Sequence, residues 1–194
     1  MASSFDFEHL SALSGLPRSF DFERSGLSTK VAIIGPESTG KTTLARYLAK
    51  RYHGIFVPEY ARSFVEQLMA ERQTDDWTKV LTYDDLCTLA QHQIETLTSP
   101  PFMGESEGGL YFFDTDLLVT KVWFNYAFGR IPEWLNEAIL RYPMDVYLLT
   151  YPDLPWVPDP TRSNGSDAIR LELFRRYESE IQSLDIPYYI IRHT

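Results

Sequence analysis

The chain has 194 residues, of which 44% are hydrophobic and 23% charged, and this size and composition predict a globular domain with a substantial core. A formal net charge of −9 disfavours a nucleic-acid-binding surface, because such surfaces are normally basic. No segment has the apolar length of a membrane span, and the N-terminus lacks the basic and apolar regions of a signal peptide. We therefore expect a cytoplasmic protein without nucleic-acid or membrane partners.

Cysteine and histidine usage limits the metal chemistry. The single cysteine, Cys87, excludes an intramolecular disulfide and a zinc–cysteine cluster, and it fits the core side of a predicted helix. The four histidines are scattered and form neither a metal-ligand cluster nor an H-x-G-H pattern. This distribution argues against a zinc site and against a nucleotidyltransferase.

The first 28 residues differ from the rest of the chain. They are rich in Ser, Asp and Glu, and the pentapeptide SFDFE occurs twice, at residues 4–8 and 19–23. This spacing is too short for a solenoid repeat. We expect residues 1–28 to be an extension whose phenylalanines pack on the domain or on a neighbouring molecule, and residues 29–194 to form a single domain.

The segment VAIIGPESTGKT, residues 31–42, contains a complete G-x-x-x-x-G-K-[ST] pattern between an apolar run and an amphipathic segment. Its glycines allow backbone N–H groups to point at a phosphate, and the following helix adds partial positive charge there. Lys41 can reach the β- and γ-phosphates, and the Thr42 hydroxyl can ligate Mg²⁺. The pattern predicts that ATP and Mg²⁺ are bound by Gly35, Pro36, Glu37, Ser38, Thr39, Gly40, Lys41, Thr42 and Thr43.

Apolar runs alternate with amphipathic segments from residue 30 onward, which predicts strands separated by helices. The expected strands are residues 31–34, 55–57, 110–113, 146–149 and 188–191. The expected helices are residues 42–52, a segment around 64–69, 82–98, 116–128, 132–142 and a segment from 166 to 184, with residues 70–82 irregular. Right-handed crossovers then give an α/β P-loop NTPase fold, with a five-stranded, mostly parallel sheet covered by helices on both faces.

Charged residues follow three of the predicted strands. In a parallel sheet the carboxyl ends of the strands meet at one edge, where ligands bind. Asp114 follows four apolar residues, so we expect it to hold Mg²⁺ water ligands opposite Thr42 rather than only to cap a helix. For Asp116 two roles remain open, namely capping the next helix or binding a substrate hydroxyl.

A kinase that phosphorylates an alcohol needs a group that accepts the hydroxyl proton and orients the oxygen. Glu59, at the end of the second predicted strand, is the first candidate, and Asp116 is the second. The alternative for Glu59 is a structural ion pair with Arg62 or another arginine.

The proline-rich segment WVPDPTR, residues 156–162, predicts a lid that brings Arg162 to the transferred phosphoryl group. Arg170 and Arg175 are alternatives on the face of the next helix. Tyr60, Trp123 and Trp156 are candidates for stacking on a flat ring, although for any one of them packing is the more common role.

Four motifs together resemble a known family. The loop GPESTGKTTLA, the segment VPEYAR (57–62), the segment DTDLLVT (114–120) and WVPDPTR are similar to the ribosylnicotinamide kinase domain of NadR-type proteins, over about residues 30–191. The resemblance implies transfer of the ATP γ-phosphate to the 5′-hydroxyl of nicotinamide riboside. It also implies a nucleoside-kinase-like fold with Arg162 in the lid and a riboside site around Glu59, Tyr60, Arg62, Asp116 and Trp123.

Full-length members of that family also carry an adenylyltransferase domain and sometimes a DNA-binding helix-turn-helix, for which 194 residues leave no room. We therefore expect a stand-alone kinase or a detached module. Two alternatives remain open: a P-loop kinase for a different nucleoside, and an ATP-binding regulatory module with a protein partner.

Overall fold

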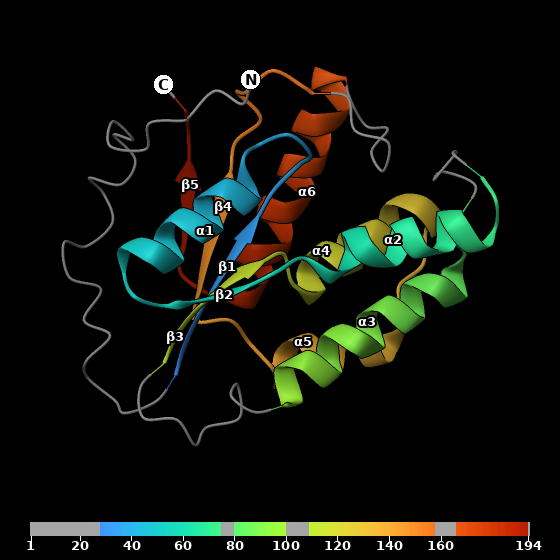
Figure 1. Ribbon diagram of the computed structural model, residues 1–194, viewed down its shortest axis with the longest axis horizontal. Helices are drawn as coiled ribbons and strands as arrows, with labels where there is room; N and C mark the ends of the chain where they lie inside the picture. Colours follow the sequence, from blue (N-terminus) through green and yellow to red (C-terminus); the bar gives the residue numbers. More distant parts are fainter. Residues whose placement is uncertain (1–27, 75–79, 100–108, 158–165, 194) are drawn as a thin grey trace.

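A computed structural model describes residues 28–74, 80–99, 109–157 and 166–193. This part of the chain forms one five-stranded sheet and six helices (Figure 1). The strands are β1 (Thr29–Ile34), β2 (Ile55–Val57), β3 (Leu110–Asp114), β4 (Val146–Thr150) and β5 (Tyr188–Ile191). The helices are α1 (Lys41–Arg51), α2 (Tyr60–Glu71), α3 (Tyr83–Thr98), α4 (Leu117–Phe128), α5 (Glu133–Arg141) and α6 (Asp167–Leu184).

The sheet has the order β2-β3-β1-β4-β5, and every pair of neighbouring strands is parallel. At least one helix follows each of the first four strands before the next strand begins, and because all neighbouring strands are parallel, all five carboxyl ends lie at the same edge. The predicted α/β P-loop fold is confirmed. Of the predicted lid segment, residues 156–162, residues 158–162 lie outside the described residues.

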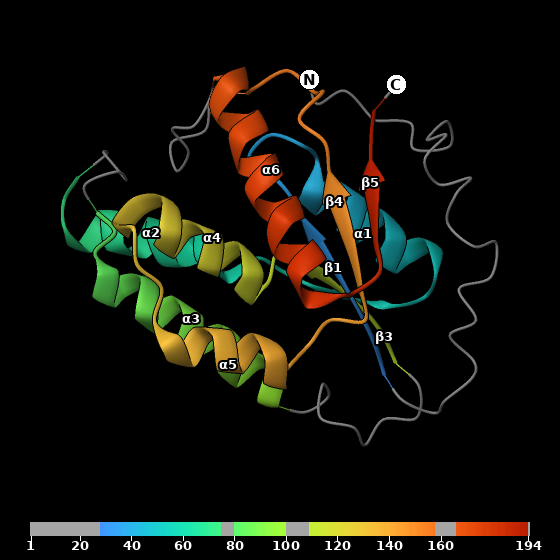
Figure 2. The ribbon, with the colours of Figure 1, turned by 180° about the vertical axis from the view of Figure 1, so that it is seen from behind.

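Helices cover both faces of the sheet. Val31 and Ile33 of β1 pack with Leu44 and Leu48 of α1 in one core cluster. Ala32 belongs to a larger cluster on the opposite face, which is built mainly from α3, α4, α5 and α6. Figure 1 shows α1 in front of the sheet, and Figure 2 shows α6 over the other face, with α2–α5 grouped beside the sheet. A central strand that is buried on both sides explains the uninterrupted apolar run VAII.

Side chains that the sequence marked as helix starts act as caps. Thr82 accepts a hydrogen bond from the N–H of Asp85 at 3.2 Å at the start of α3, and Ser166 accepts from Ile169 at the start of α6, also at 3.2 Å. Gly129 ends α4 with a φ of 64°, as its position predicted. The boundary of α2 differs slightly, because it continues to Glu71, into the segment expected to be irregular; a bond from Gln67 Nε2 to Glu71 Oε1 supports this last turn.

None of the described helices is both long enough and apolar enough to cross a membrane.

The phosphate-binding loop, residues 35–41, lies directly against the end of β4. Gly35 has a φ of 144°, and a Cβ atom on it would lie 2.3 Å from Thr150 Oγ1 and 2.7 Å from the Thr150 carbonyl oxygen. These distances are far below a van der Waals contact, and one of the two atoms belongs to the backbone. The first glycine of the motif is therefore required by a close approach of two chain segments as well as by its φ.

We expect Gly35→Ala to lower the free energy of unfolding by about 3–5 kcal/mol, because backbone strain and overpacking against Thr150 add together. Gly129→Ala is the matched control, since Gly129 also has a positive φ but a Cβ there meets nothing within 4 Å. That variant is expected to lose only about 1 kcal/mol. Urea unfolding followed by circular dichroism measures both, and equal losses would contradict the packing argument.

Candidate active site

The start of α1 follows the phosphate-binding loop and has no side-chain cap. Gly40 is the N-cap of α1, has a φ of 75°, and provides no side-chain acceptor for the first N–H groups of the helix. The first turn of α1 also contains no acidic residue. The positive end of the helix dipole is therefore directed at this loop, which favours an anion there.

The carbonyl groups of the loop are turned outward and accept hydrogen bonds from surrounding side chains. Lys41 Nζ donates to the Pro36 carbonyl at 2.7 Å, and Thr39 Oγ1 donates to the same oxygen at 2.8 Å. Thr150 Oγ1 donates to the Ile34 carbonyl at 3.1 Å and lies 2.6 Å from Thr39 Oγ1. If Lys41 turns toward a phosphate, Thr39 remains as a donor to Pro36, so the loop keeps its shape.

Arg170 of α6 lies beneath the loop and is only 1% exposed. Its Nε donates to the Glu37 carbonyl at 3.2 Å, and one of its terminal nitrogens donates to the carbonyls of Ser38 at 3.4 Å and Leu154 at 2.8 Å. The sequence placed Arg170 on a helix face as an alternative to the lid arginine, and the structure shows it fully buried. A signal was present, because residue 170 falls on the apolar stripe that contains Leu173 and Tyr177.

The turn after β3 separates the two aspartates. Phe112 of β3 packs in the core cluster on the α1 side of the sheet. Because side chains two residues apart on a strand share a face, Asp114 lies on that same face, where Thr42 stands in the first turn of α1. Thr115 has a φ of 71°, which is strained for a β-branched residue and redirects the chain between Asp114 and Asp116. Strained backbone of this kind is frequent where side chains must be aimed for function.

Asp114 fits the proposed role in holding Mg²⁺. It is 2% exposed, and within the described part of the chain neither of its carboxylate oxygens has a hydrogen-bond partner. A buried carboxylate without donors is costly unless another group compensates it. No group of three or more His, Cys, Asp or Glu side chains among the described residues could hold a metal. A magnesium ion here would therefore also need the Thr42 hydroxyl, nucleotide oxygens and water as ligands.

Asp116 acts as the N-cap of α4. Its Oδ1 accepts from the Leu118 N–H at 3.2 Å, and its Oδ2 accepts from the Tyr147 hydroxyl at 2.7 Å. Burial raises the pKa of Asp116 to about 6, although the bond from Tyr147 and the backbone bonds oppose the shift. Of the two roles that the sequence left open, capping is the one that the described contacts show. A bond to a substrate hydroxyl stays a prediction.

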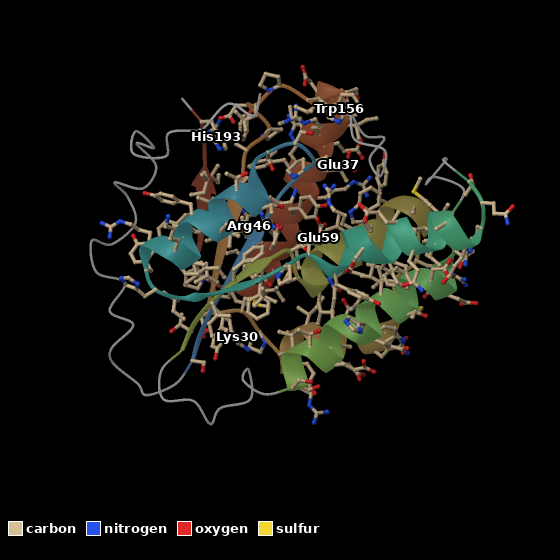
Figure 3. All side chains as sticks on the ribbon, in the orientation of Figure 1. Lys30, Glu37, Arg46, Glu59, Trp156 and His193 are labelled. Carbon is tan, nitrogen blue, oxygen red and sulfur yellow. The ribbon has the colours of Figure 1, made fainter. Side chains whose placement is uncertain are left out.

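A cavity of about 110 Å³ opens beside the phosphate-binding loop. Its lining includes Lys41 from the loop, Glu59 and Arg62 around the start of α2, Trp123 of α4 and Tyr177 of α6. Figure 3 shows Glu37 and Glu59 toward the same end of the sheet, while Lys30 lies at the opposite end. Three of the five predicted substrate residues thus line one cavity with the predicted catalytic lysine.

The other two predicted substrate residues lie in a smaller neighbouring cavity of about 40 Å³, which Tyr60 and Asp116 line together. The Tyr60 ring stacks on His92 with 3.7 Å between the ring centroids. Arg162 falls outside the described residues. Trp156 precedes that segment, and its buried indole nitrogen has no hydrogen-bond partner within the described part of the chain.

Sequence reasoning missed Tyr177 as a lining residue because its place on an apolar stripe indicated only core. Its hydroxyl forms a hydrogen bond with the Trp123 side chain. Burial raises the pKa of Tyr177, and the nearby carboxylates of Glu37 and Glu59 raise it further. Negative charge therefore lies near Tyr177, in a cavity that Lys41 and Arg62 also line.

A family model described as AAA domain matches residues 30–194 of the chain. The chain belongs to this AAA-domain family. It is also 30% identical, over 142 residues, to the trifunctional NAD biosynthesis/regulator protein NadR of Escherichia coli (strain K12). That match covers 73% of this chain but 33% of NadR, so the chain spans about one third of the length of the curated relatives it matches.

Solved structures share the fold. NadR in complex with NR has a TM-score of 0.64 at 24% identity and covers 84% of this chain and 43% of that chain. NadR in complex with NAD and AMP-PNP has a TM-score of 0.59 at 26% identity, over 86% of this chain and 44% of that chain. Thymidylate kinase from Ehrlichia chaffeensis has a TM-score of 0.54 at 14% identity, over 87% and 88%. The predicted resemblance to NadR and the nucleoside-kinase-like fold are confirmed.

We expect Arg170→Met to raise the KM for ATP roughly 10-fold and to cost about 2–4 kcal/mol of stability, because two loop carbonyls and the Leu154 carbonyl lose their donor. Arg170→Lys should recover part of both losses, since it restores a donor but not the planar fork. Arg176→Met is the control on the same helix, where the half-buried side chain pairs with Glu172 and lies over the Tyr126 ring. Steady-state kinetics and thermal unfolding measure the effects; an unchanged KM in Arg170→Met would contradict the proposed support of the loop.

The pKa of Asp116 predicts a pH-dependent stability difference. Because the folded-state pKa of about 6 lies above the ordinary 3.8, protonation stabilises the folded protein. This contribution is fully present below pH 4 and is lost as the pH rises through 6, by about 3 kcal/mol in all. We expect Asp116→Asn, which stays neutral, to gain stability relative to wild type between pH 4 and pH 7. Thermal unfolding of wild type and variant at each pH measures this difference, and Asp84→Asn, at an exposed position, is the control. A stability difference between Asp116→Asn and wild type that does not change with pH would contradict the prediction.

Proposed function

We propose that this chain is a nucleoside kinase of NAD metabolism that transfers the γ-phosphate of MgATP to the 5′-hydroxyl of nicotinamide riboside, giving nicotinamide mononucleotide. The observation that supports the reaction type is the single cavity shared by the loop residue Lys41, the carboxylate Glu59 and the aromatic pair Trp123 and Tyr177. A phosphate-binding loop, a proton acceptor and a wall for a flat ring are the parts that such a transfer requires.

The donor side is held by the loop and α1. The backbone N–H groups of the non-proline residues in the loop bind the phosphates, and Lys41 exchanges its bond to the Pro36 carbonyl for the transferred phosphoryl group. Thr42 and Asp114 would hold Mg²⁺, which neutralises charge on the β- and γ-phosphates. Arg162, from the predicted lid, would add positive charge as the bond to the leaving ADP oxygen breaks.

The acceptor side is held by the cavity. Glu59 lies at the N-cap of α2, and its carboxylate accepts the proton of the 5′-hydroxyl as that oxygen attacks the γ-phosphorus. The oxygen–phosphorus bond to ADP breaks as the new bond forms, so no covalent enzyme intermediate is needed. Arg62, on the same cavity wall, is placed to bind a riboside hydroxyl or a phosphate oxygen.

The charge of the acceptor site favours nicotinamide riboside over common nucleosides. Its pyridinium ring carries a positive charge, whereas adenosine, cytidine, uridine and thymidine are neutral. A cationic ring gains from the faces of Trp123 and Tyr177 and from the nearby carboxylates of Glu37 and Glu59. The NadR structure in complex with NR supports the same choice by homology.

A coupled ADP-release assay with MgATP tests the proposal, using nicotinamide riboside beside adenosine, cytidine, uridine and thymidine. We expect riboside-dependent ADP release that falls roughly 10²–10³-fold in Lys41→Ala and roughly 10²–10⁴-fold in Glu59→Gln. Glu66→Gln, an exposed carboxylate on α2, is the matched control and should be unaffected.

If only a neutral nucleoside is turned over, the kinase mechanism stands and nicotinamide riboside is excluded as the substrate. If the protein binds ATP but turns over no nucleoside, the kinase function is contradicted and a nucleotide-binding regulatory module is favoured. Full activity in Glu59→Gln would exclude Glu59 as the proton acceptor.

A further inference from the structure

One wall of the acceptor cavity contains a hydrogen bond between two helices. Thr120 Oγ1 of α4 donates to Gln93 Oε1 of α3 at 2.8 Å, and both residues line the cavity together with Trp123, which lies one turn along α4 from Thr120. Figures 1 and 2 both show α3 beside α4, in the group of helices next to the sheet. An amide group therefore lies close to the proposed aromatic wall.

The hydroxyl of Thr120 is used differently from those of its helical neighbours. Thr88 and Thr96 of α3 each donate to the backbone carbonyl four residues earlier, at 3.0 Å, which is the ordinary behaviour of threonine in a helix. Thr120 instead donates its proton to the Gln93 side chain. In this arrangement Oε1 lies toward Thr120 and the Nε2 group is directed away from it.

The Nε2 group of Gln93 is an available donor. Within the described part of the chain no acceptor binds it, and it is not among the enclosed polar atoms that lack a partner. Gln93 is half-buried and lines both the acceptor cavity and the smaller cavity beside it. Two N–H groups are therefore presented to a ligand, while the oxygen of the same amide is already satisfied.

We propose that Gln93 determines base specificity by donating a hydrogen bond to a carbonyl oxygen on the acceptor ring, with Thr120 as the positioning residue that fixes the amide. This inference rests on the proposed function and deepens it: the substrate class is a cationic ribosyl ring that carries an exocyclic carbonyl group. The carboxamide of nicotinamide has such an oxygen. A donor that finds no acceptor in the bound state loses its hydrogen bond to water, so a ring without the carbonyl is bound less well.

The test is a cycle of enzyme variants against two substrates, nicotinamide riboside and 1-ribosylpyridinium, which keeps the charge and lacks the carboxamide. Gln93→Met removes the donors at similar length, and we expect kcat/KM to fall roughly 10-fold for nicotinamide riboside and less than about 2-fold for ribosylpyridinium. For Thr120→Val we expect a smaller loss of kcat/KM that again affects nicotinamide riboside more than ribosylpyridinium, because the Gln93 amide is then free to turn over. Gln91→Met, exposed on the same helix, is the matched control.

Riboside affinity measured by calorimetry with an unreactive ATP analogue gives a readout besides turnover, and circular dichroism melting checks the fold of each variant. Equal losses for the two substrates in Gln93→Met would overturn the specificity role while leaving the kinase intact. A wild-type enzyme that turns over neither riboside would overturn the proposed function and this assignment with it.

Discussion

A phosphate-binding loop must turn its N–H groups inward, so its carbonyl groups have to find donors on the outside. In this protein the carbonyls of residues 34, 36, 37 and 38 receive hydrogen bonds from Thr150, from Thr39 and Lys41, and from Arg170. Two of these donors come from the end of β4 and from α6, more than 100 residues away in the chain. The shape of the loop therefore depends on the whole fold. The tightest such contact is the close approach of Gly35 to Thr150.

The same contacts explain how a chain with a negative net charge can present positive charge at its phosphate-binding loop. The formal net charge is −9, yet Lys41 and the buried Arg170 place two positive charges at the loop. Arg170 also holds the Leu154 carbonyl, and Ser38 contacts Val157, so the segment that leads to the predicted lid is tied to the loop. The carboxylates of Glu37 and Glu59 raise the pKa of Tyr177, so negative charge lies near this side chain in the same cavity that Lys41 and Arg62 line.

Much of this arrangement was predictable from local patterns. The motif GPESTGKT, the alternation of apolar runs with amphipathic segments, and the polar residues after strands identified the fold, the donor site and the edge of the sheet that carries Glu59 and Asp114. Helix caps such as Thr82 and Ser166 could be predicted from the sequence because a cap depends on residues three positions apart. Signals of this kind need no knowledge of which helices meet.

Other features depended on tertiary structure. From the sequence alone, Arg170 was placed on a helix face and Tyr177 in the core. Because α6 packs against the loop and α4, Arg170 supports the loop and Tyr177 lines the cavity. Gln93 and Thr120 are 27 residues apart, and their hydrogen bond exists because α3 packs on α4. The sequence by itself determined the nucleotide-binding motif and the strand-and-helix order, since these follow from local propensity and periodicity. Tertiary structure alone decided which side chains share the acceptor cavity, because that depends on contacts between distant segments.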